Sequence, residues 1–520
     1  MGERARVQYT LMTFLKYLLG MSAMISSQNS FDDTMRGVFK TVLLSMSVAK
    51  NTAFMTAASV GQKIISFFYF TLIARLLGPE DTGKYFLALS FTTIFVIFVD
   101  LGLTNVFVRE SAKAKENMQE YFSTILSVKM ILAVLTYATL VCVTILFGYD
   151  VELRSMIYLS GITMLFDTLH LSLYGVLRSI GKLKYEAMSI VASQFVTLIL
   201  GGFFLYFRLP IIFLILAFTI SSFLNVCFAT WAVRSHHIAL RPRFNKTVFF
   251  VLARIAIPFA LAAVFARFYS YIDSLLLSKY LGQTAVGWYS IPYKITYAFQ
   301  FIPLALVAAL YPRFSEFFAT DKTRLAYLFE RGMKYLLIIV LPIAVGIAVL
   351  SEDIILTLYT DSYAPSIVPL QILMAGLVFS FISFPIGALL NACNKQAVQT
   401  MIVGFALCVN IVLNTLLIPV HGVIGAAVAA LIGNMLLTIL GYAVIPKITQ
   451  MNHWFIVRSI LQLTIAAGCM GYGVWMVNDH VHFVVAIAVG ILIYAIMLFV
   501  TQAVRIHDIR EATLLLKRRS

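Results

Sequence analysis

Long apolar stretches follow one another along almost the whole chain, and each has about the length that crosses a lipid bilayer. A transmembrane helix needs about 20 predominantly apolar residues. Strands of a membrane barrel would alternate between polar and apolar residues, and these stretches do not, so we expect helices. About fourteen are predicted, near residues 54–76, 85–108, 121–147, 155–177, 187–207, 210–233, 248–278, 287–311, 333–350, 366–392, 397–418, 421–445, 455–477 and 481–504.

The scarcity of charge supports this interpretation. Of the 520 residues, 61% are hydrophobic and 12% are charged, whereas soluble domains carry about 25% charged residues. A chain with so little charge cannot cover a surface that faces water on all sides. The predicted fold class is therefore an all-α polytopic membrane protein, which excludes a water-soluble enzyme.

The positions of Lys and Arg predict the orientation in the membrane. When the N-terminus is placed inside, most of the 39 Lys and Arg residues fall in alternate, inner segments. Such an excess is typical of the cytoplasmic side. We therefore expect a multi-pass protein of the cell (plasma) membrane with both termini cytoplasmic. This asymmetry also accounts for the net charge of +16, so membrane lipids are expected partners and nucleic acid is not.

A short, glycine-containing corner occurs twice in the sequence. RLLGPEDTGKYF (75–86) and KYLGQTAVGWYS (279–290) share a cation, a Leu-Gly pair and a Gly-x-Tyr at the same spacing, 204 residues apart. An even number of expected helices separates the copies, so both have the same orientation and represent parallel repeats. The glycines would supply the turn geometry and allow two helices to approach closely.

The repeat predicts the domain organisation. We expect an N-terminal cytoplasmic or interfacial segment at 1–50, an N-lobe of helices 1–6 at 51–234, a basic cytoplasmic linker at 235–247, a C-lobe of helices 7–12 at 248–448, helices 13 and 14 at 449–505, and a basic cytoplasmic tail at 506–520. The first segment is apolar but short, so it has three interpretations: an interfacial helix, a signal-like segment, or an over-extended start of the gene. We favour a segment that does not span the membrane.

Several motifs, in order along about 50–450, resemble those of a known family. They are ARLLGPEDTGKYF (74–86), DLGLTNVFVRE (100–110), YIDSLLLSKYLGQTAVGWYS (271–290), LYPRFSE (310–316), LYTDSYAPS (358–366) and NIVLNTLLIPVHGVIGAAVA (410–429). Together they are similar to the polysaccharide or oligosaccharide flippases of the MOP exporter superfamily, of the O-antigen translocase type.

The resemblance implies two pseudo-symmetric six-helix lobes around a central cavity that opens to each side in turn. It implies transport of a polyprenyl-pyrophosphate-linked oligosaccharide from the inner to the outer leaflet, for cell-surface polysaccharide or glycan biosynthesis. Glycan-assembly enzymes could be further partners, and so could a coupling cation, although the membrane potential alone could drive the export of an anionic cargo. Such flippases use no ATP-binding domain, and the sequence has no G-x-x-x-x-G-K-[ST] motif; no cofactor is expected.

Charged residues inside the predicted spans are the candidate site residues, because a charge in the bilayer usually faces a cavity or a partner. Lys63 and Arg267 occupy matched positions on helices 1 and 7, and Lys294 lies on helix 8. These cations would bind the diphosphate, Arg in a fork and Lys as a point charge. The alternative is internal ion pairing, Arg267 with Asp273 or Lys63 with Asp100. A further cation, Lys129, is expected to extend to the inner surface instead.

The acidic residues in the spans have two interpretations. Asp167, with His170 three residues later, Asp273 and Asp100 could serve ion coupling or be satisfied structural groups; for Asp100 the structural alternative is a contact with the neighbouring Arg109. A group of tyrosines on helices 7 and 8 could stack on sugar rings, or simply pack in the core and at the interface: Tyr269, Tyr271, Tyr289, Tyr293 and Tyr297.

Other classes of function are less consistent with the sequence. The five cysteines lie in apolar spans without a C-x-x-C motif, and His480 with His482 alone is a weak metal signal, so no metal site is expected. A membrane glycosyltransferase or polymerase would need a large outer loop with catalytic carboxylates, so we do not expect an enzyme. Two alternatives within the superfamily stay open: a lipid II flippase, and a drug or cation antiporter, although the latter would favour an acidic cavity.

Overall fold

The computed structural model describes residues 28–504, and the surroundings of the side chains from Ala58 onward except at positions 258 and 259. The chain divides into two compact units, Met1–Ala57 and Ala58–Ser520. All contacts given below lie within the second unit. The expected N-terminal segment and basic tail fall mostly or wholly outside the described residues.

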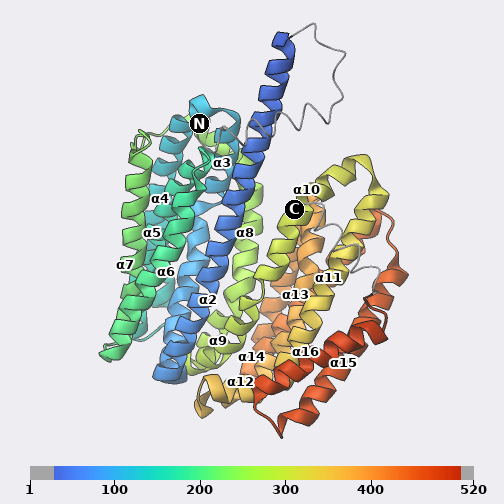
Figure 1. Ribbon diagram of the computed structural model, residues 1–520. Coiled ribbons are helices and arrows are strands. Elements are labelled where there is room, and N and C mark those ends of the chain that lie inside the picture. Colours follow the sequence, from blue (N-terminus) through green and yellow to red (C-terminus); the bar gives the residue numbers. More distant parts are fainter. Residues whose placement is uncertain (1–27, 505–520) are drawn as a thin grey trace, which may run out of the picture. The chain divides into compact units, whose positions relative to one another are not determined.

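The described part of the chain is helical and contains no strands (Figure 1). The N-lobe consists of α2 (Gln28–Asp100), α3 (Leu103–Lys113), α4 (Met118–Leu146), α5 (Val151–Ser179), α6 (Leu183–Tyr206) and α7 (Ile212–Arg234). The C-lobe consists of α8 (Lys246–Leu281), α9 (Gln283–Ala298), α10 (Phe301–Thr320), α11 (Lys322–Val349), α12 (Ser351–Leu358), α13 (Ile367–Ala392) and α14 (Gln396–Val444). Two further helices, α15 (His453–Asn478) and α16 (Phe483–Val500), pack on each other and on α11. The predicted fold class is confirmed.

Among the described residues, twelve helical segments are long and apolar enough to cross a membrane. Two of these segments, Ala58–Asp100 with 43 residues and Gln396–Lys447 with 52, are about twice as long as one crossing requires. Each contains one glycine with non-helical torsion angles, Gly78 and Gly422 respectively. A division at these glycines would accommodate the two additional helices expected, but the exact number of fourteen stays a prediction, as do the domain boundaries.

The recurring corner has the same backbone conformation in both copies. Gly78 has φ 79° and ψ 180°, and Gly282 has φ 81° and ψ −172°. A positive φ of this kind is readily adopted only by glycine. The sequence repeat therefore predicted a real structural repeat, in which each glycine separates two consecutive helices of its lobe.

The second glycine of each corner lies where the two lobes cross. A Cβ added to Gly83 would overlap the backbone carbonyl of Gln283, and a Cβ added to Gly287 would overlap the backbone carbonyl of Pro79. Gly83 and Gly287 are equivalent in the repeat, as are Pro79 and Gln283. The expected close helix approach is confirmed, and it is a contact between the lobes rather than within either one.

Hydrogen bonds between the lobes gather at the same end of the molecule, which we name the corner end because Gly78 and Gly282 lie there. Within the described residues, every hydrogen bond that joins α2–α7 to α8–α14 is at this end. The bonded pairs are Thr71–Tyr359, Arg75–Thr357, Arg75–Leu358, Tyr149–Ser278, Tyr363–Ala74 and Tyr363–Thr82. The lobes are therefore joined to one another at the corner end.

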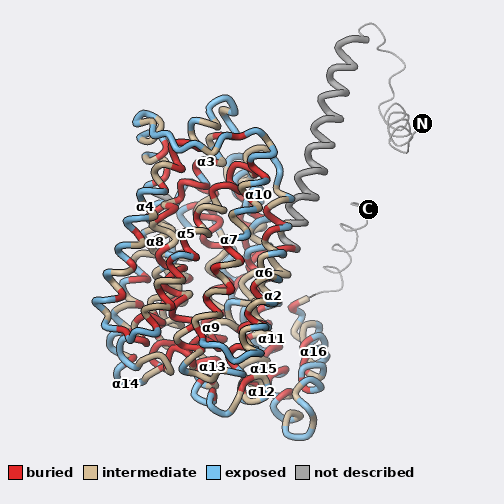
Figure 2. The backbone as a smooth tube through the Cα atoms, turned by 90° about the vertical axis from the view of Figure 1, so that its left-hand side faces the viewer, coloured by how far each residue is buried: buried red, intermediate tan, exposed pale blue. Residues whose placement is uncertain are grey.

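The hydrophobic core consists of one cluster shared by the two lobes and one that lies almost entirely in the N-lobe. The residues coloured as buried lie along the interior of the helix bundle (Figure 2). One large cluster includes side chains of both lobes, for example Phe70 and Phe86 with Tyr289. A second cluster, with Phe107 and Phe122, is built from N-lobe helices together with the linker and the first turns of α8. Apart from that start of α8, the C-lobe contributes nothing to the second cluster.

Candidate functional site

Three of the cations expected inside the membrane lie on helices that face one another across the two lobes. Lys63 is on α2, Arg267 is on α8 and Lys294 is on α9. The Lys63 ammonium lies over the ring of Tyr297, 4.7 Å from its centroid, so an N-lobe cation contacts a C-lobe aromatic ring. Arg267 is exposed on α8, at the position of the repeat equivalent to Lys63.

Lys294 makes the reverse contact. Its ammonium, which belongs to the C-lobe, lies 5.1 Å from the ring centroid of Phe70 and 5.5 Å from that of Phe86, both in the N-lobe. The ring of Phe86 in turn packs edge-on against that of Tyr293, with 5.5 Å between the ring centroids.

Tyr293 completes the connection between the cations, because its ring stacks on that of Tyr297 at 6.0 Å with an interplanar angle of 10°. Two of the three cations, Lys63 and Lys294, thus contact one interlobe aromatic cluster. It consists of Phe70, Phe86, Tyr293 and Tyr297.

No carboxylate in the described part of the chain lies within ion-pair distance of Lys63, Arg267 or Lys294. The ion pairs considered from the sequence are not formed, because the acids have other partners. Asp100 pairs with Lys129, and Asp273 accepts hydrogen bonds from Tyr289 and Asn414. The positive charge of the three cations is therefore not neutralised within the described protein.

Lys129 differs from these three, and the expectation that it extends to the membrane surface is wrong. Its ammonium is buried and donates to Asp100, to Thr104 Oγ1 at 2.6 Å and to Ser172 Oγ at 2.8 Å. These three acceptors match the three donors of an ammonium group. The packing of α3, α4 and α5 brings the acid and the two hydroxyls within reach, so neither Lys129 nor Asp100 needs a ligand.

The expected contact of Asp100 with Arg109 is also absent from the described structure, where Arg109 pairs with Glu110. Asp100 also accepts a hydrogen bond from Thr104. The structural interpretation of Asp100 therefore has direct support.

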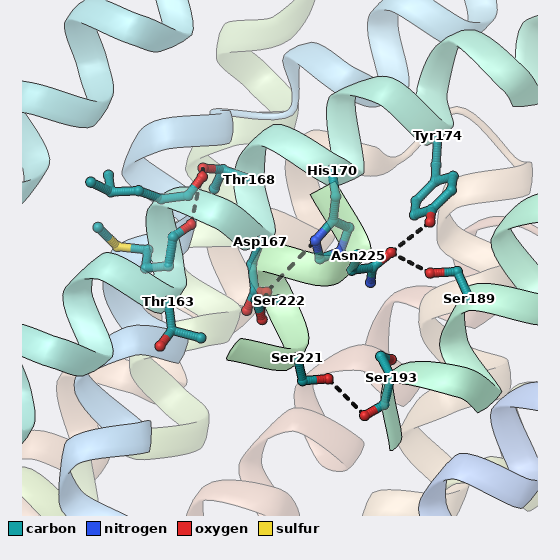
Figure 3. A network of polar contacts seen from close by, with 12 residues as sticks. Thr163, Asp167, Thr168, His170, Tyr174, Ser189, Ser193, Ser221, Ser222 and Asn225 are labelled. Atoms are coloured by element: carbon teal, nitrogen blue, oxygen red, sulfur yellow. Dashed lines mark hydrogen bonds and ion pairs between the residues drawn. The ribbon is translucent and has the colours of Figure 1, made fainter. Parts of the chain in front are cut away.

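Asp167 and His170 lie together in the N-lobe, as their spacing on one helix predicts (Figure 3). His170 Nδ1 is 3.7 Å from Asp167 Oδ1, which is longer than a hydrogen bond. Ser222 of α7 donates to Asp167 Oδ1 at 2.6 Å. The Asp167 side chain keeps 38% of its surface exposed.

Polar contacts continue from this pair along the same three helices. Tyr174 of α5 and Ser189 of α6 both donate to Asn225 Oδ1 of α7 (Figure 3). Together with the Ser222–Asp167 bond, these contacts tie α5, α6 and α7 into one unit. They explain the pair structurally and leave a role in ion coupling untested.

Asp273 is the acidic centre of the C-lobe and is almost fully buried, with 5% of its surface exposed. Tyr289 donates to Oδ2 at 2.8 Å and Asn414 donates to Oδ1 at 2.7 Å. Asn414 also donates to the backbone and side-chain oxygens of Asn410, one helical turn earlier. Two buried amide atoms, Asn410 Nδ2 and Asn414 Oδ1, have no partner among the described residues.

Sequence reasoning missed part of this arrangement. The asparagines at 410 and 414 lie one turn apart in an apolar helix, and that spacing is a signal for a shared polar contact. The aromatic partners Phe70 and Phe86 carry no such signal, because phenylalanine is common throughout the chain. One of the two histidines of the weak metal signal, His480 and His482, has a structural role. His482 Nδ1 accepts a hydrogen bond from the Val484 backbone N–H and so caps the start of α16.

The sequence matches known families over much of its length. The family described as "Polysaccharide biosynthesis protein" matches residues 48–318, just over half of the chain. The chain belongs to this family. A second family, MatE, matches residues 258–416.

Relatives of the polysaccharide biosynthesis protein family extend the similarity over most of the chain. This chain is 22% identical over 478 residues to the "Probable low-salt glycan biosynthesis flippase Agl15" of Haloferax volcanii, and the match covers 88% of this chain and 97% of the relative. It is 24% identical to the "Capsular polysaccharide biosynthesis protein CapF" of Staphylococcus aureus, covering 76% of this chain and 98% of the relative.

Solved structures show the same fold for this family member. "Lipid II flippase MurJ, inward closed conformation" superimposes with a TM-score of 0.71 at 17% identity, covering 85% of this chain and 97% of that chain. An inward-facing multidrug resistance MATE transporter of the MOP superfamily has a TM-score of 0.60 at 14% identity, covering 78% of this chain and 96% of that chain. These likenesses concern the fold alone, which is that of a two-lobed, all-α, multi-pass membrane protein.

Proposed function

We propose that this protein is an alternating-access flippase, which moves a polyprenyl-pyrophosphate-linked oligosaccharide from the inner to the outer leaflet of the plasma membrane. The observation that carries the proposal is that two unneutralised cations, Lys63 and Lys294, contact one aromatic cluster between the lobes. Arg267, at the position equivalent to Lys63 in the repeat, is the third cation. The names of the glycan flippase and capsular relatives are consistent with this cargo.

The energetics of the three cations favour an anionic cargo. A cation over an aromatic ring gains about 0.5–2 kcal/mol. Hydrogen bonds to a charged group contribute about 1.5–3 kcal/mol each, and a diphosphate offers several acceptors. The diphosphate therefore competes successfully with the rings for Lys63 and Lys294, and Arg267 is free to bind it as well. An internal carboxylate would have held these cations as firmly as the cargo does, and the described lobes place none beside them.

The joined corner end suggests where the cargo enters. With both termini cytoplasmic, the corner end faces outward, so a molecule with its lobes joined there is open only to the inner leaflet. In this proposal the cargo enters from the inner leaflet, and separation of the lobes at the corner end releases it outside. Glycan-assembly enzymes at the inner surface would supply the cargo. The membrane potential favours the step, because each negative charge moved outward gains about 2.3 kcal/mol per 100 mV.

A coupling cation would reset the empty carrier, and Asp273 is the acid that we assign to it. Asp273 is buried in one lobe, away from any cationic side chain that would neutralise it among the described residues, and Asn414 Oδ1 beside it lacks a donor. Asp167 of the N-lobe is the second candidate. Asp100 is excluded from this role by its contact with Lys129.

The test is transport by the full chain reconstituted in vesicles, with three cargoes offered separately. We expect a polyprenyl-diphosphate oligosaccharide to cross faster than in protein-free vesicles, and lipid II and a cationic drug to cross slowly or not at all. Equal rates with and without protein would overturn the proposal. Preferential movement of lipid II or of the drug would favour one of the alternative cargoes, and formation of new sugar bonds would indicate an enzyme.

A further inference from the structure

The C-lobe contains a partly enclosed cavity of about 100 Å³ beside the interlobe aromatic cluster. Helices α8, α9, α13 and α14 contribute to its wall. Two of the lining residues, Tyr293 and Tyr297, belong to the cluster itself. The polar side chains that line the remainder include Gln300, Ser380, Asn410 and Asn434.

The polar groups of this cavity have unused hydrogen-bonding capacity. Asn410 is fully buried, and its Nδ2 has no partner among the described residues. Within the same residues, the Gln300 side-chain amide and the Ser380 hydroxyl form no hydrogen bond, and Asn434 uses only its oxygen, to accept from Tyr269 at 3.3 Å. The unpaired buried amide of Asn410 is costly. With the unused groups of Gln300, Ser380 and Asn434 around the same cavity, it indicates a polar ligand that both donates and accepts.

The cavity and the cation site share a wall. Tyr297 lines the cavity, and Lys63 lies over its ring at 4.7 Å. A diphosphate held by Lys63 and Arg267 would therefore place its own covalent neighbour at the mouth of the cavity. In a lipid-linked glycan that neighbour is the first sugar ring on one side and the polyprenyl chain on the other.

The lining distinguishes between these two neighbours. A polyprenyl chain has no hydrogen-bonding groups, so it would leave the amides and the hydroxyl unpaired. A sugar ring has both hydroxyl groups and apolar C–H faces, and the latter suit aromatic rings. The cavity also contains Asp273, whose negative charge would repel an acidic sugar.

We propose that this cavity is a subsite for the sugar ring attached directly to the diphosphate, and that the ring is a neutral, hydroxylated one. The inference rests on the proposed function and extends it: the C-lobe recognises the first sugar while the interlobe cations bind the diphosphate. Recognition at this position would give the carrier a preference among glycans that share the same lipid anchor.

The experiment compares three probes in vesicles that contain the full chain: polyprenyl diphosphate with one neutral hexose, the same lipid with one glucuronic acid, and the sugar-free lipid. The variants are Gln300→Met and Asn434→Leu, which remove amides from the cavity with little change in size. The matched control is Gln194→Met, because Gln194 is a buried N-lobe glutamine whose Nε2 also lacks a partner in the described residues. Accumulation and thermal stability of each variant are measured alongside.

We expect the wild-type chain to move the hexose probe fastest. Each cavity variant should slow the hexose probe about five- to tenfold, as for a lost hydrogen bond or two, while the sugar-free probe is unaffected. The Gln194→Met control should resemble the wild type.

Equal slowing of the hexose and sugar-free probes, or no slowing of either, would overturn the subsite but leave the flippase function intact. A preference for glucuronic acid would overturn the neutral-sugar assignment. If the wild type moves none of the three probes, the proposed function fails, and the subsite with it.

Discussion

Tyr363 of the C-lobe donates its hydroxyl to the backbone carbonyl of Ala74 in the N-lobe, over 3.0 Å. The same hydroxyl lies 2.9 Å from Thr82 Oγ1, and the Tyr363 side chain is 0% exposed. One buried side chain thus bonds to two segments of α2 in the other lobe, one on each side of Gly78. Such a contact must break whenever the lobes separate at the corner end.

The substitution Tyr363→Phe should therefore favour separation at the corner end. Hydrogen bonds contribute about 0.5–1.5 kcal/mol each, so the population with the corner end open should rise about tenfold. The measurement is the labelling rate of Ala285→Cys, a position 3% exposed at the start of α9, in a chain whose native cysteines are replaced. Tyr472→Phe, at an exposed tyrosine, is the control, and unchanged labelling in Tyr363→Phe would contradict the prediction.

The crossing of Gly83 with Gly287 makes a second prediction. A side chain at Gly83 would overlap a backbone carbonyl of the other lobe. A backbone carbonyl cannot rotate out of the way as a flexible side chain can. Overpacking costs about 1–3 kcal/mol, so Gly83→Val should hold the corner end open and reduce transport at least about tenfold. Gly202→Val is matched, because Gly202 also lies in a helix but has nothing within 4 Å of an added Cβ. Equal transport by the two variants would show that the crossing is not a gate.

The buried Lys129–Asp100 pair should contribute to stability rather than to transport. Lys129→Met leaves the Asp100 carboxylate buried without its cation, a loss of about 3–5 kcal/mol. The double variant Lys129→Met/Asp100→Asn removes both charges and should recover most of that loss. Thermal denaturation in detergent measures both effects. The control is Lys113→Met, in an ion pair whose lysine is 57% exposed; it should lower the free energy of unfolding by no more than about 1 kcal/mol. An equally small loss of stability in Lys129→Met would refute the assignment of the buried pair.

Arg267→Ala should abolish glycan display on the cell surface while the protein still inserts and accumulates. The reason is that Arg267 is the one forked donor among the three interlobe cations, and a fork binds diphosphate through two bonds. Arg254→Ala removes an exposed arginine from the same helix and should leave display normal. Normal display in Arg267→Ala would remove that residue from the mechanism.

Sequence reasoning reached the fold and its repeat because both depend on local patterns. Apolar length predicts spans, and the glycines at 78 and 282 mark a turn that few other residues allow. The sequence defines the number of crossings less well, because a helix that continues through a kinked glycine has no polar loop to mark its end. The kinks at Gly78 and Gly422 are of this kind.

The candidate site was predicted less completely because its contacts join distant parts of the chain. The sequence identified Lys63, Arg267 and Lys294 as intramembrane cations, but their aromatic partners depend on how the lobes are placed. The incorrect expectation for Lys129 has the same origin. A flexible lysine can reach a surface or a buried acid, and only the packing of α3, α4 and α5 decides between them.

The reciprocal crossing has an evolutionary consequence. Gly83 meets Gln283 while Gly287 meets Pro79, which is the pattern of a twofold-symmetric homodimer, where each subunit uses one patch against its copy. An ancestral protein of half this length would have carried both sides of the contact in a single gene. Fusion of two such copies would require no new interface, which would leave each half free to differ elsewhere.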